Sequence, residues 1–494
     1  MTNLIRNVST PILIGALLSI ATGFACLYDL GQFPVFQWDE ARYVNNSVEI
    51  AQNGHWLDYR MDGEIDHWNF KPPLVLWMQA LSMKIFGYTE LGARLPSALA
   101  GIGIALLLYW FCVTRLKSLL AGVVAVLFFL ASPGFFGPHM GRSADLDAVQ
   151  TFVVLAYVLY FLRYLLGDYP PARSFAVLGG LVFGAFLCKG MPGLLLLPYL
   201  AIIGLLPGNN RKLLPHKSLY LFAGLTLLAC AAYYGLREWQ SPGYWALVKK
   251  SEFNRFSGEG LGWHKHPWDF YLTNFTELKR YPLIWFVPLT LSAFFVALSP
   301  LIRRVYGYFL GIAVGYLAFI SWPPVKLEWY DAPLYPLFAL LWGIAVSAAA
   351  ERVELWQKRR LAWGLALVLT LPLCMSSYRL VWEKIQYHPD KMADFEREGV
   401  LIRQIENTLP DFQVDFAVVK TVKHPEHLDQ VKFYQKTWKI RFGVDIGIVT
   451  DPQTLSAGQI VLIAQPATLE AVRARFPGAS VLFESPYGQL LDLH

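Results

Sequence analysis

The stretch from residue 29 to 90 carries acidic, basic and aromatic side chains in close succession. Asp39 and Glu40 follow an apolar run of membrane-spanning length, where an ionised group is costly unless it has a partner or a task. A carboxylate there can accept the proton of an attacking hydroxyl, while Arg42 and Lys71 can stabilise a phosphate leaving group. The alternatives are ion pairing among these residues and an aromatic loop resting at a membrane surface.

A second acidic group lies in the run from Gly141 to Asp147, which opens another apolar stretch. Asp145 or Asp147 can cap the helix that begins there, because a carboxylate accepts from free backbone N–H groups and favours the positive end of the helix. Both carboxylates are also expected in the same compartment as Asp39. A role in a shared site is therefore the competing interpretation.

Two later loops add further candidate ligands. The loop 237–282 contains Arg255, His264 and His266, and two histidines at this spacing form half of a metal site or simply a solvated pair. The loop 322–331 contains Lys326 and Tyr330 among aromatic residues. These two side chains are candidate contacts for a phosphate or a sugar.

The elements that must position these residues are apolar helices. The chain has 494 residues, of which 55% are hydrophobic and 16% charged, with a mean hydropathy of +0.38. This balance predicts an all-α polytopic membrane protein. About eleven runs have the length that a hydrocarbon core of about 30 Å requires, near 11–28, 92–114, 118–137, 149–166, 174–188, 191–206, 218–236, 283–299, 305–321, 332–349 and 361–376.

The distribution of Lys and Arg orients these spans. If 174–188 and 191–206 are separate spans with Lys189 at the outer surface, every short basic loop falls on one side, which the positive-inside rule makes the cytoplasm. Merging the two runs would bury Lys189 and place the later basic loops outside. We therefore expect two spans here, and we expect the motif-rich loops 29–90 and 237–282 to share the outer face.

The tail changes character after about residue 384. Strand-like runs at 414–419, 459–464 and 480–484 alternate with helix-like stretches, which predicts a small soluble α/β domain over 385–494 after a membrane domain over 1–384. The formal charge of +6 fits cytoplasmic loops and does not indicate a nucleic-acid partner. The five cysteines show no metal-ligand spacing.

In the order of its motifs the chain resembles the C-type glycosyltransferases, which include lipid A aminoarabinose transferases and, more distantly, protein O-mannosyltransferases. The resemblance is collinear over most of the membrane region. It rests on Asp39-Glu40, Arg42-Tyr43, Asp62-Gly63-Glu64, Lys71-Pro72-Pro73-Leu74, Ala93-Arg94-Leu95-Pro96-Ser97-Ala98, Asp147-Ala148, Lys189-Gly190, Arg255-Phe256 with His264, and Lys326 with Tyr330.

The resemblance implies roles for individual residues. Asp39 would be the catalytic carboxylate with Asp147 in support, and Lys71 and Arg42 would contact phosphate. The other expected substrate contacts are Glu40, Tyr43, Asp145, Lys189, Arg255, His264, Lys326 and Tyr330. The aminoarabinose transferases place a divalent metal between the loop histidine, here His264, and an acidic residue whose position is Phe70 in this chain. Asp66, His67 or His266 would have to supply the missing ligand.

The expected activity is transfer of a sugar, with inversion, from an undecaprenyl-phosphate donor. The acceptor would be lipid A, another glycan or a protein, at the periplasmic face of the inner membrane. A lipid or polyprenyl-phosphate transporter is the main alternative, and a noncatalytic assembly subunit is a third. Charged residues midway along the spans would favour transport. The ionisable residues here cluster at span ends on one face, which favours catalysis.

Overall fold

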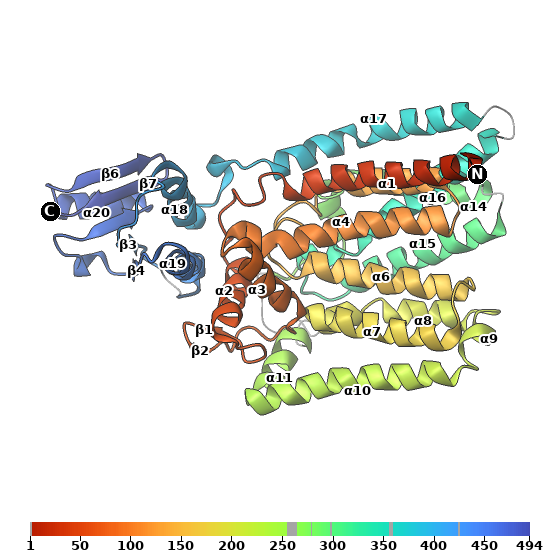
Figure 1. Ribbon diagram of the computed structural model, residues 1–494, viewed down its shortest axis with the longest axis horizontal. Coiled ribbons are helices and arrows are strands. Elements are labelled where there is room, and N and C mark those ends of the chain that lie inside the picture. Colours follow the sequence, from red (N-terminus) through yellow and green to blue (C-terminus); the bar gives the residue numbers. More distant parts are fainter. Residues whose placement is uncertain (1, 254–263, 278, 297–298, 355–358, 423–424) are drawn as a thin grey trace.

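The computed structural model describes residues 2–253, 264–277, 279–296, 299–354, 359–422 and 425–494. A long helical bundle forms one end of the molecule and a small α/β domain forms the other (Figure 1). A short helical segment from the N-terminal part of the chain lies between them. This arrangement confirms the predicted fold class.

Eight helices in the described residues are long and apolar enough to cross a membrane. Their internal backbone hydrogen bonds satisfy the polar groups that lipid cannot. They are α1 (Thr2–Leu27), α4 (Glu90–Thr114), α6 (Asp147–Leu165), α7 (Pro171–Lys189), α10 (Lys217–Gln240), α15 (Pro300–Ser321), α16 (Leu334–Glu354) and α17 (Arg359–Ile385). The chain is thus a multi-pass membrane protein.

The other three predicted spans are shorter apolar elements. They are α5 (Leu119–Leu130), η1 with α8 (Met191–Leu194 and Leu197–Leu205), and η4 with α14 (Pro282–Leu291 and Ser292–Val296). Pro288 lies inside the 3-10 helix η4, and proline disrupts regular α-helical hydrogen bonding in a helix interior. The expected break at Lys189 is confirmed, because α7 ends there, but the second run is shorter than the eight spanning helices.

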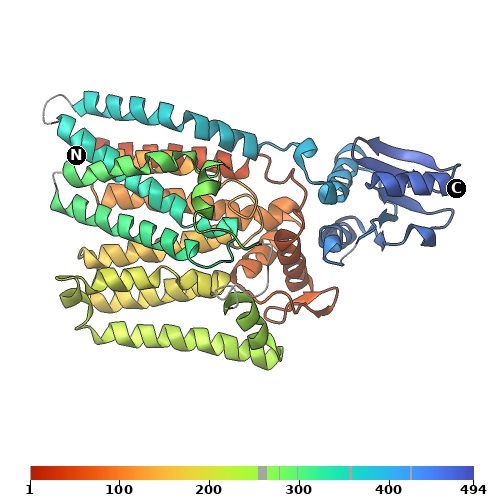
Figure 2. The same ribbon diagram turned by 180° about the vertical axis from the view of Figure 1, so that it is seen from behind.

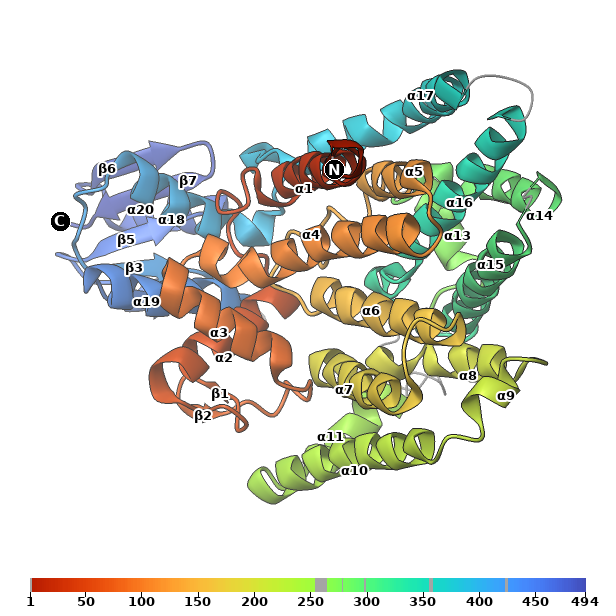
Figure 3. The same ribbon diagram turned by 45° about the vertical axis from the view of Figure 1, so that its right-hand side comes forward.

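Packing within the bundle centres on α16, whose residues are mostly buried and which lies against α5 and α15. A Cβ at Gly343 would come within 2.4 Å of the Ala121 carbonyl oxygen, so the close approach of α16 to α5 requires glycine there. From α4 the bundle continues through α6 and α7 to α10, which forms one edge, while α1 and α17 lie together at the other (Figure 3).

The segment between the bundle and the C-terminal domain comes from residues 28–89. It contains α2 (Asp39–Asn53), a two-stranded hairpin of β1 (Arg60–Met61) and β2 (Glu64–Ile65), and the apolar helix α3 (Leu74–Phe86). α2 packs on α3, and α3 packs on α4 of the bundle. The start of α2 is therefore held at the end of the spanning helices.

The C-terminal domain is a five-stranded sheet in the order β4-β3-β5-β7-β6. β3 runs parallel to β4 and β5, and β7 runs antiparallel to β5 and β6. Its elements are α18 (Arg397–Thr408), β3 (Phe416–Val419), α19 (Asp429–Phe442), β4 (Ile446–Val449), β5 (Ile460–Ile463), α20 (Pro466–Arg475), β6 (Ser480–Ser485) and β7 (Gly488–Asp492). The domain projects from the bundle in the reverse view as well (Figure 2).

α19 attaches this domain to the segment that contains α2. The Tyr434 hydroxyl donates to Glu90 at 2.8 Å and accepts from the backbone N–H of Val35 at 3.1 Å. Arg42 of α2 pairs with Asp429 at 3.0 Å. These contacts fix the domain over the segment 28–89 and the start of α4.

Candidate active site

A polar pocket of about 440 Å³ lies where α2, α6 and α7 meet the short 3-10 helix η5 (Glu328–Asp331). Seven of the residues predicted from the sequence line it, namely Asp39, Tyr43, Lys71, Asp145, Asp147, Lys189 and Tyr330. Its remaining lining residues are Trp68, Asn69, Phe70, Leu327 and Trp329. The structure thus brings together residues separated by nearly 300 positions in the sequence.

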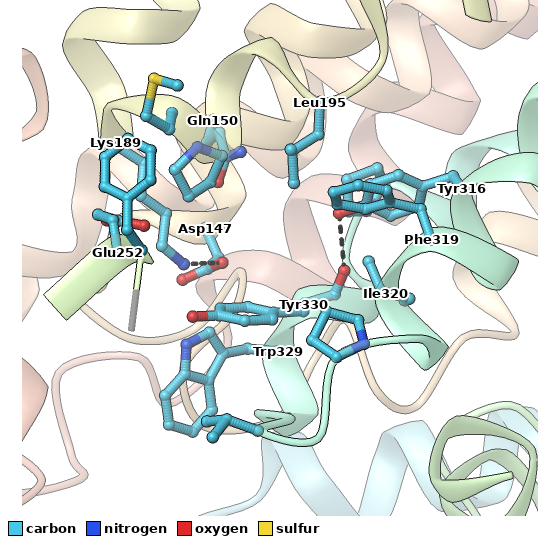
Figure 4. Close-up of a pocket in the computed structure, with 16 residues that line it drawn as sticks. Asp147, Gln150, Lys189, Leu195, Glu252, Tyr316, Phe319, Ile320, Trp329 and Tyr330 are labelled. Atoms are coloured by element: carbon cyan, nitrogen blue, oxygen red, sulfur yellow. Dashed lines mark hydrogen bonds and ion pairs between the residues drawn. The ribbon is translucent and has the colours of Figure 1, made fainter. Parts of the chain in front are cut away.

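Two adjacent helices place an ion pair in this pocket. Asp147 is the first residue of α6 and Lys189 is the last residue of α7, and both side chains are buried. The Lys189 ammonium group donates to the Asp147 carboxylate (Figure 4). Gly190 then takes φ of +80°, a conformation that residues with a Cβ rarely adopt. The chain can therefore turn directly after Lys189, leaving the lysine at the pocket.

Asp39 begins α2 at the other side of the pocket. Burial raises the pKa of its carboxyl group above the ordinary value, and the nearby His139 opposes part of this rise. A carboxylate with a raised pKa accepts a proton more readily near neutral pH than an ordinary aspartate does. The position and the environment of Asp39 both suit a general base.

Lys71 lies in the segment between the hairpin and α3. Its ammonium group pairs with Glu252 and lies 4.2 Å from the centre of the Phe70 ring. The Tyr59 hydroxyl donates to the Lys71 carbonyl oxygen at 3.0 Å, which holds the backbone in place. Lys71 and Lys189 together give the pocket two ammonium groups, each paired with a carboxylate.

An apolar pocket of about 850 Å³ adjoins the polar one and shares Asp147, Lys189, Trp329 and Tyr330 with it. The rest of its lining is mainly hydrophobic, including Met191, Pro192, Leu195, Phe253, Tyr316, Phe319, Ile320, Pro323, Val325 and Pro333, with Gln150 and Glu252 as polar members. Tyr316 donates to the Tyr330 carbonyl oxygen at 2.9 Å (Figure 4). The two pockets together suit an amphiphile with an anionic head and an apolar chain.

Glu40 does not line either pocket. Its carboxylate is fully buried and pairs with Arg94 through contacts of 2.7 and 2.8 Å. It also accepts from the backbone N–H groups of Phe36 at 2.7 Å and Ala144 at 2.6 Å. Glu40 therefore ties the start of α2 to α4 and to the loop before α6, and its predicted contact with substrate stays a prediction.

Arg42 is also directed elsewhere. Its guanidinium pairs with Asp429 and stacks 4.4 Å from the centre of the Trp68 ring. It lines neither of the two pockets described above. Its pair with Asp429 joins α2 to the C-terminal domain, and its predicted phosphate contact stays a prediction.

The later loops are only partly placed at the site. The Lys326 ammonium group donates to the carbonyl oxygens of His266 at 2.9 Å and Pro323 at 2.6 Å, so it holds two loop segments together. The backbone N–H of Lys326 donates to the His264 carbonyl oxygen, and neither residue lines the polar pocket. Arg255 falls outside the described residues.

The metal predicted at His264 gains no ligand set from the described residues. Among the described residues, one group of three side chains has atoms of the kind that bind metal ions close together. It consists of Asp39, His139 and Asp145, whose ligand atoms lie within 4.8 Å of one another. Phe70, which lines the pocket, offers no ligand atom. The His264 metal site stays a prediction.

Among the residues at or beside the site that sequence reasoning missed are His139, Glu252 and Trp329. The ring of His139 stacks on Trp329 at 4.1 Å between centroids, and its Nδ1 lies 3.3 Å from Asp145. His139 sits only six residues before Asp145, so it could have been included with that acidic run. Glu252 had no local signal, because its partner Lys71 is 181 positions away.

Comparisons with known proteins agree with this architecture. Residues 70–234 match the family model of dolichyl-phosphate-mannose-protein mannosyltransferases. The chain is 30% identical over 347 residues to the undecaprenyl phosphate-alpha-4-amino-4-deoxy-L-arabinose arabinosyl transferase of Aeromonas salmonicida, covering 66% of this chain and 59% of the relative. The arabinosyl transferase 2 of Pseudomonas fluorescens, which acts on the same kind of donor by its name, is 30% identical over 379 residues. That match covers 74% of this chain and 63% of the relative. The chain thus spans about six-tenths of the length of these relatives.

The fold is also similar to that of solved structures. ArnT from Cupriavidus metallidurans bound to undecaprenyl phosphate superposes with a TM-score of 0.66 at 15% identity, and the match covers 98% of each chain. The apo form gives a TM-score of 0.62 at 16% identity, also with 98% coverage of each. These structural matches show that the fold is shared, and the sequence similarities described above confirm the resemblance to C-type glycosyltransferases that the motifs indicated.

Proposed function

We propose that this protein transfers a sugar from a polyprenyl-phosphate carrier to an acceptor, using Asp39 as the general base. The observation that carries the proposal is the continuity of two pockets at Asp147 and Lys189. One pocket offers three carboxylates and two ammonium groups, and the other offers a mainly apolar wall. A sugar joined to a lipid by a phosphate has the same sequence of chemical groups. The names of the relatives, which include an undecaprenyl-phosphate sugar, give the same donor class.

The proposed sugar transfer is a single displacement, in which the acceptor replaces the phosphate at the anomeric carbon. The donor phosphate would lie near Lys71 and Lys189, and its isoprenoid chain would lie along the apolar pocket. Asp39 takes the proton of the acceptor hydroxyl or amine as that atom forms its bond to the anomeric carbon. The bond from this carbon to the phosphate oxygen breaks, and the electron pair stays on the phosphate, where the lysines stabilise it. Attack opposite the leaving group inverts the anomeric carbon.

Asp147 has a supporting role in this scheme. It holds the Lys189 ammonium group at the junction of the two pockets, so the cation is in place before the donor arrives. Such preorganisation avoids reorientation as charge develops on the leaving phosphate. The proposed acceptor is lipid A, another glycan or a protein, the same three classes that the sequence indicated.

The proposed location is the bacterial inner membrane with the site at the periplasmic face. The basic loops of the chain lie between spans on the opposite side from Asp39, and such loops are retained in the cytoplasm. Cysteine substitution at exposed Glu64, followed by labelling of intact spheroplasts with a membrane-impermeant maleimide, tests this orientation. Labelling without permeabilisation is expected.

The activity test uses purified protein with a panel of undecaprenyl-phosphate sugars and a membrane extract as acceptor source. Mass spectrometry follows release of undecaprenyl phosphate and the change in mass of the acceptor. Release that requires both donor and acceptor supports transfer. Movement of intact donor between leaflets of proteoliposomes, without release from any donor, would instead support a transporter.

A further inference from the structure

His139 lies beside both the proposed base, Asp39, and a second carboxylate, Asp145. Its Nδ1 is 3.3 Å from Asp145, and ligand atoms of Asp39, His139 and Asp145 all lie within 4.8 Å of one another. The Asp145 carboxylate is buried and accepts from the Ser143 hydroxyl at 2.8 Å. A cation between two carboxylates lowers their mutual repulsion. The imidazole is in position to supply such a charge, alongside the more distant contributions of Lys71 and Lys189.

The backbone and the ring of His139 are both constrained. Its φ is +61°, in the left-handed region that residues with a Cβ seldom occupy. The ring stacks on Trp329 with an interplanar angle of 25°. Trp329 itself lines the polar pocket, so the stacking fixes the imidazole at the edge of the proposed sugar site. An uncommon backbone conformation held by a ring stack and an ion pair indicates a side chain with a defined placement.

We infer that His139 is a positioning residue whose imidazolium, anchored by Asp145, holds Asp39 ionised and oriented toward the acceptor. The inference rests on the proposed transferase function. In this arrangement Asp39 takes the acceptor's proton, while His139 keeps its own proton and contributes only its charge and position. No atom of His139 forms or breaks a bond in the transfer.

The electrostatic environment is consistent with a charged imidazole. Burial alone would lower the pKa of His139, but Asp145, followed by Asp39 and Asp147, raises that pKa to about 9. Burial would also raise the pKa of Asp145, yet His139 and Ser143 hold it below its ordinary value. Other charged groups also act on Asp39, His139 and Asp145. They are Lys71 from the segment 28–89, Asp147 from α6 and Lys189 from α7.

The test is the pH profile of kcat/KM in His139→Gln. Asp39 must be ionised to act as a base, so activity falls as pH drops through the Asp39 pKa. Removing a cation within about 4–6 Å raises that pKa, and we expect the acid limb to move to higher pH by about 1–3 units. His139→Lys keeps a positive charge and should keep the limb nearer that of the wild type. His388→Gln removes a histidine that does not line the polar pocket and should leave the profile unchanged.

Several results would overturn the inference. An acid limb at the wild-type position in both His139→Gln and His139→Asn shows that the charge does not act on Asp39. If none of the three His139 variants folds, the residue belongs to the fold alone. If the wild type binds Mn²⁺ or Zn²⁺ by calorimetry and His139→Gln does not, the three side chains hold a metal instead. Absence of carrier release from the wild type with every donor would refute the proposed function itself, independently of these comparisons.

Discussion

Replacing Glu40 by glutamine tests whether this carboxylate is structural or a substrate ligand. Its two oxygens accept from Arg94 at 2.7 and 2.8 Å and from the backbone N–H groups of Phe36 and Ala144 at 2.7 and 2.6 Å. Glutamine keeps the size but removes the charge and turns one oxygen into a donor that faces other donors. Loss of one partner from a buried ion pair costs about 3–5 kcal/mol. We expect the free energy of unfolding to fall by roughly that amount.

Activity should fall in the same variant for an indirect reason. Glu40 joins the start of α2, which carries Asp39, to the loop that carries Asp145, so both sides of the polar pocket lose a common anchor. SDS titration in mixed micelles measures the stability, and release of undecaprenyl phosphate measures the activity. Glu64→Gln, an exposed glutamate on β2, is the matched control and should change neither. Wild-type stability together with a raised donor KM in Glu40→Gln would refute the structural role and restore Glu40 as a substrate contact.

Three further predictions concern the donor, the leaving group and the metal. Leu195→Trp adds a larger side chain to the apolar pocket (Figure 4) and should raise the KM for an undecaprenyl donor about tenfold more than the KM for a short-chain donor. Ile202→Trp, at an exposed position, is the control. Equal effects on the KM of both donors would contradict the assignment of this pocket to the lipid chain. Lys71→Met should lower kcat/KM by about 10- to 100-fold in steady-state assays, because it removes a charge-assisted contact of about 1.5–3 kcal/mol. An unchanged kcat/KM would exclude a contact between Lys71 and the donor phosphate. If a divalent ion binds at His264, a chelator should lower the turnover of the wild type, and added Zn²⁺ or Mn²⁺ should restore it. The turnover of His264→Gln should be restored little by either ion. A wild-type turnover that the chelator does not change would contradict that metal site.

The sequence was sufficient to predict the membrane elements because each signal is local. A run of apolar residues predicts a helix wherever its partners lie, and the break at Lys189 followed from loop charge alone. Asp39, Asp147 and Lys189 were found because each follows, opens or ends an apolar run, whereas Lys71 was found as a cation in the motif-rich loop 29–90. The structure brings these four to one pocket.

The direction of a side chain could not be predicted in the same way. Glu40 and Arg42 are near Asp39 in the sequence, but α2 turns one toward Arg94 and the other toward Asp429. Both partners are distant in sequence, so no local pattern reveals them. Likewise β4 and β7 of the tail were not predicted, since short strands are recognised mainly through the neighbours with which they pair.

The most direct test compares Asp39→Asn with the wild type at saturating donor and acceptor. The substitution keeps the size of the side chain and removes its ability to accept the proton. Release of undecaprenyl phosphate should fall by about 10²- to 10⁴-fold, the contribution typical of general base catalysis, while the donor Kd stays within a few-fold of the wild-type value. Turnover at the wild-type rate in Asp39→Asn would show that another group activates the acceptor and would contradict the assignment of this site.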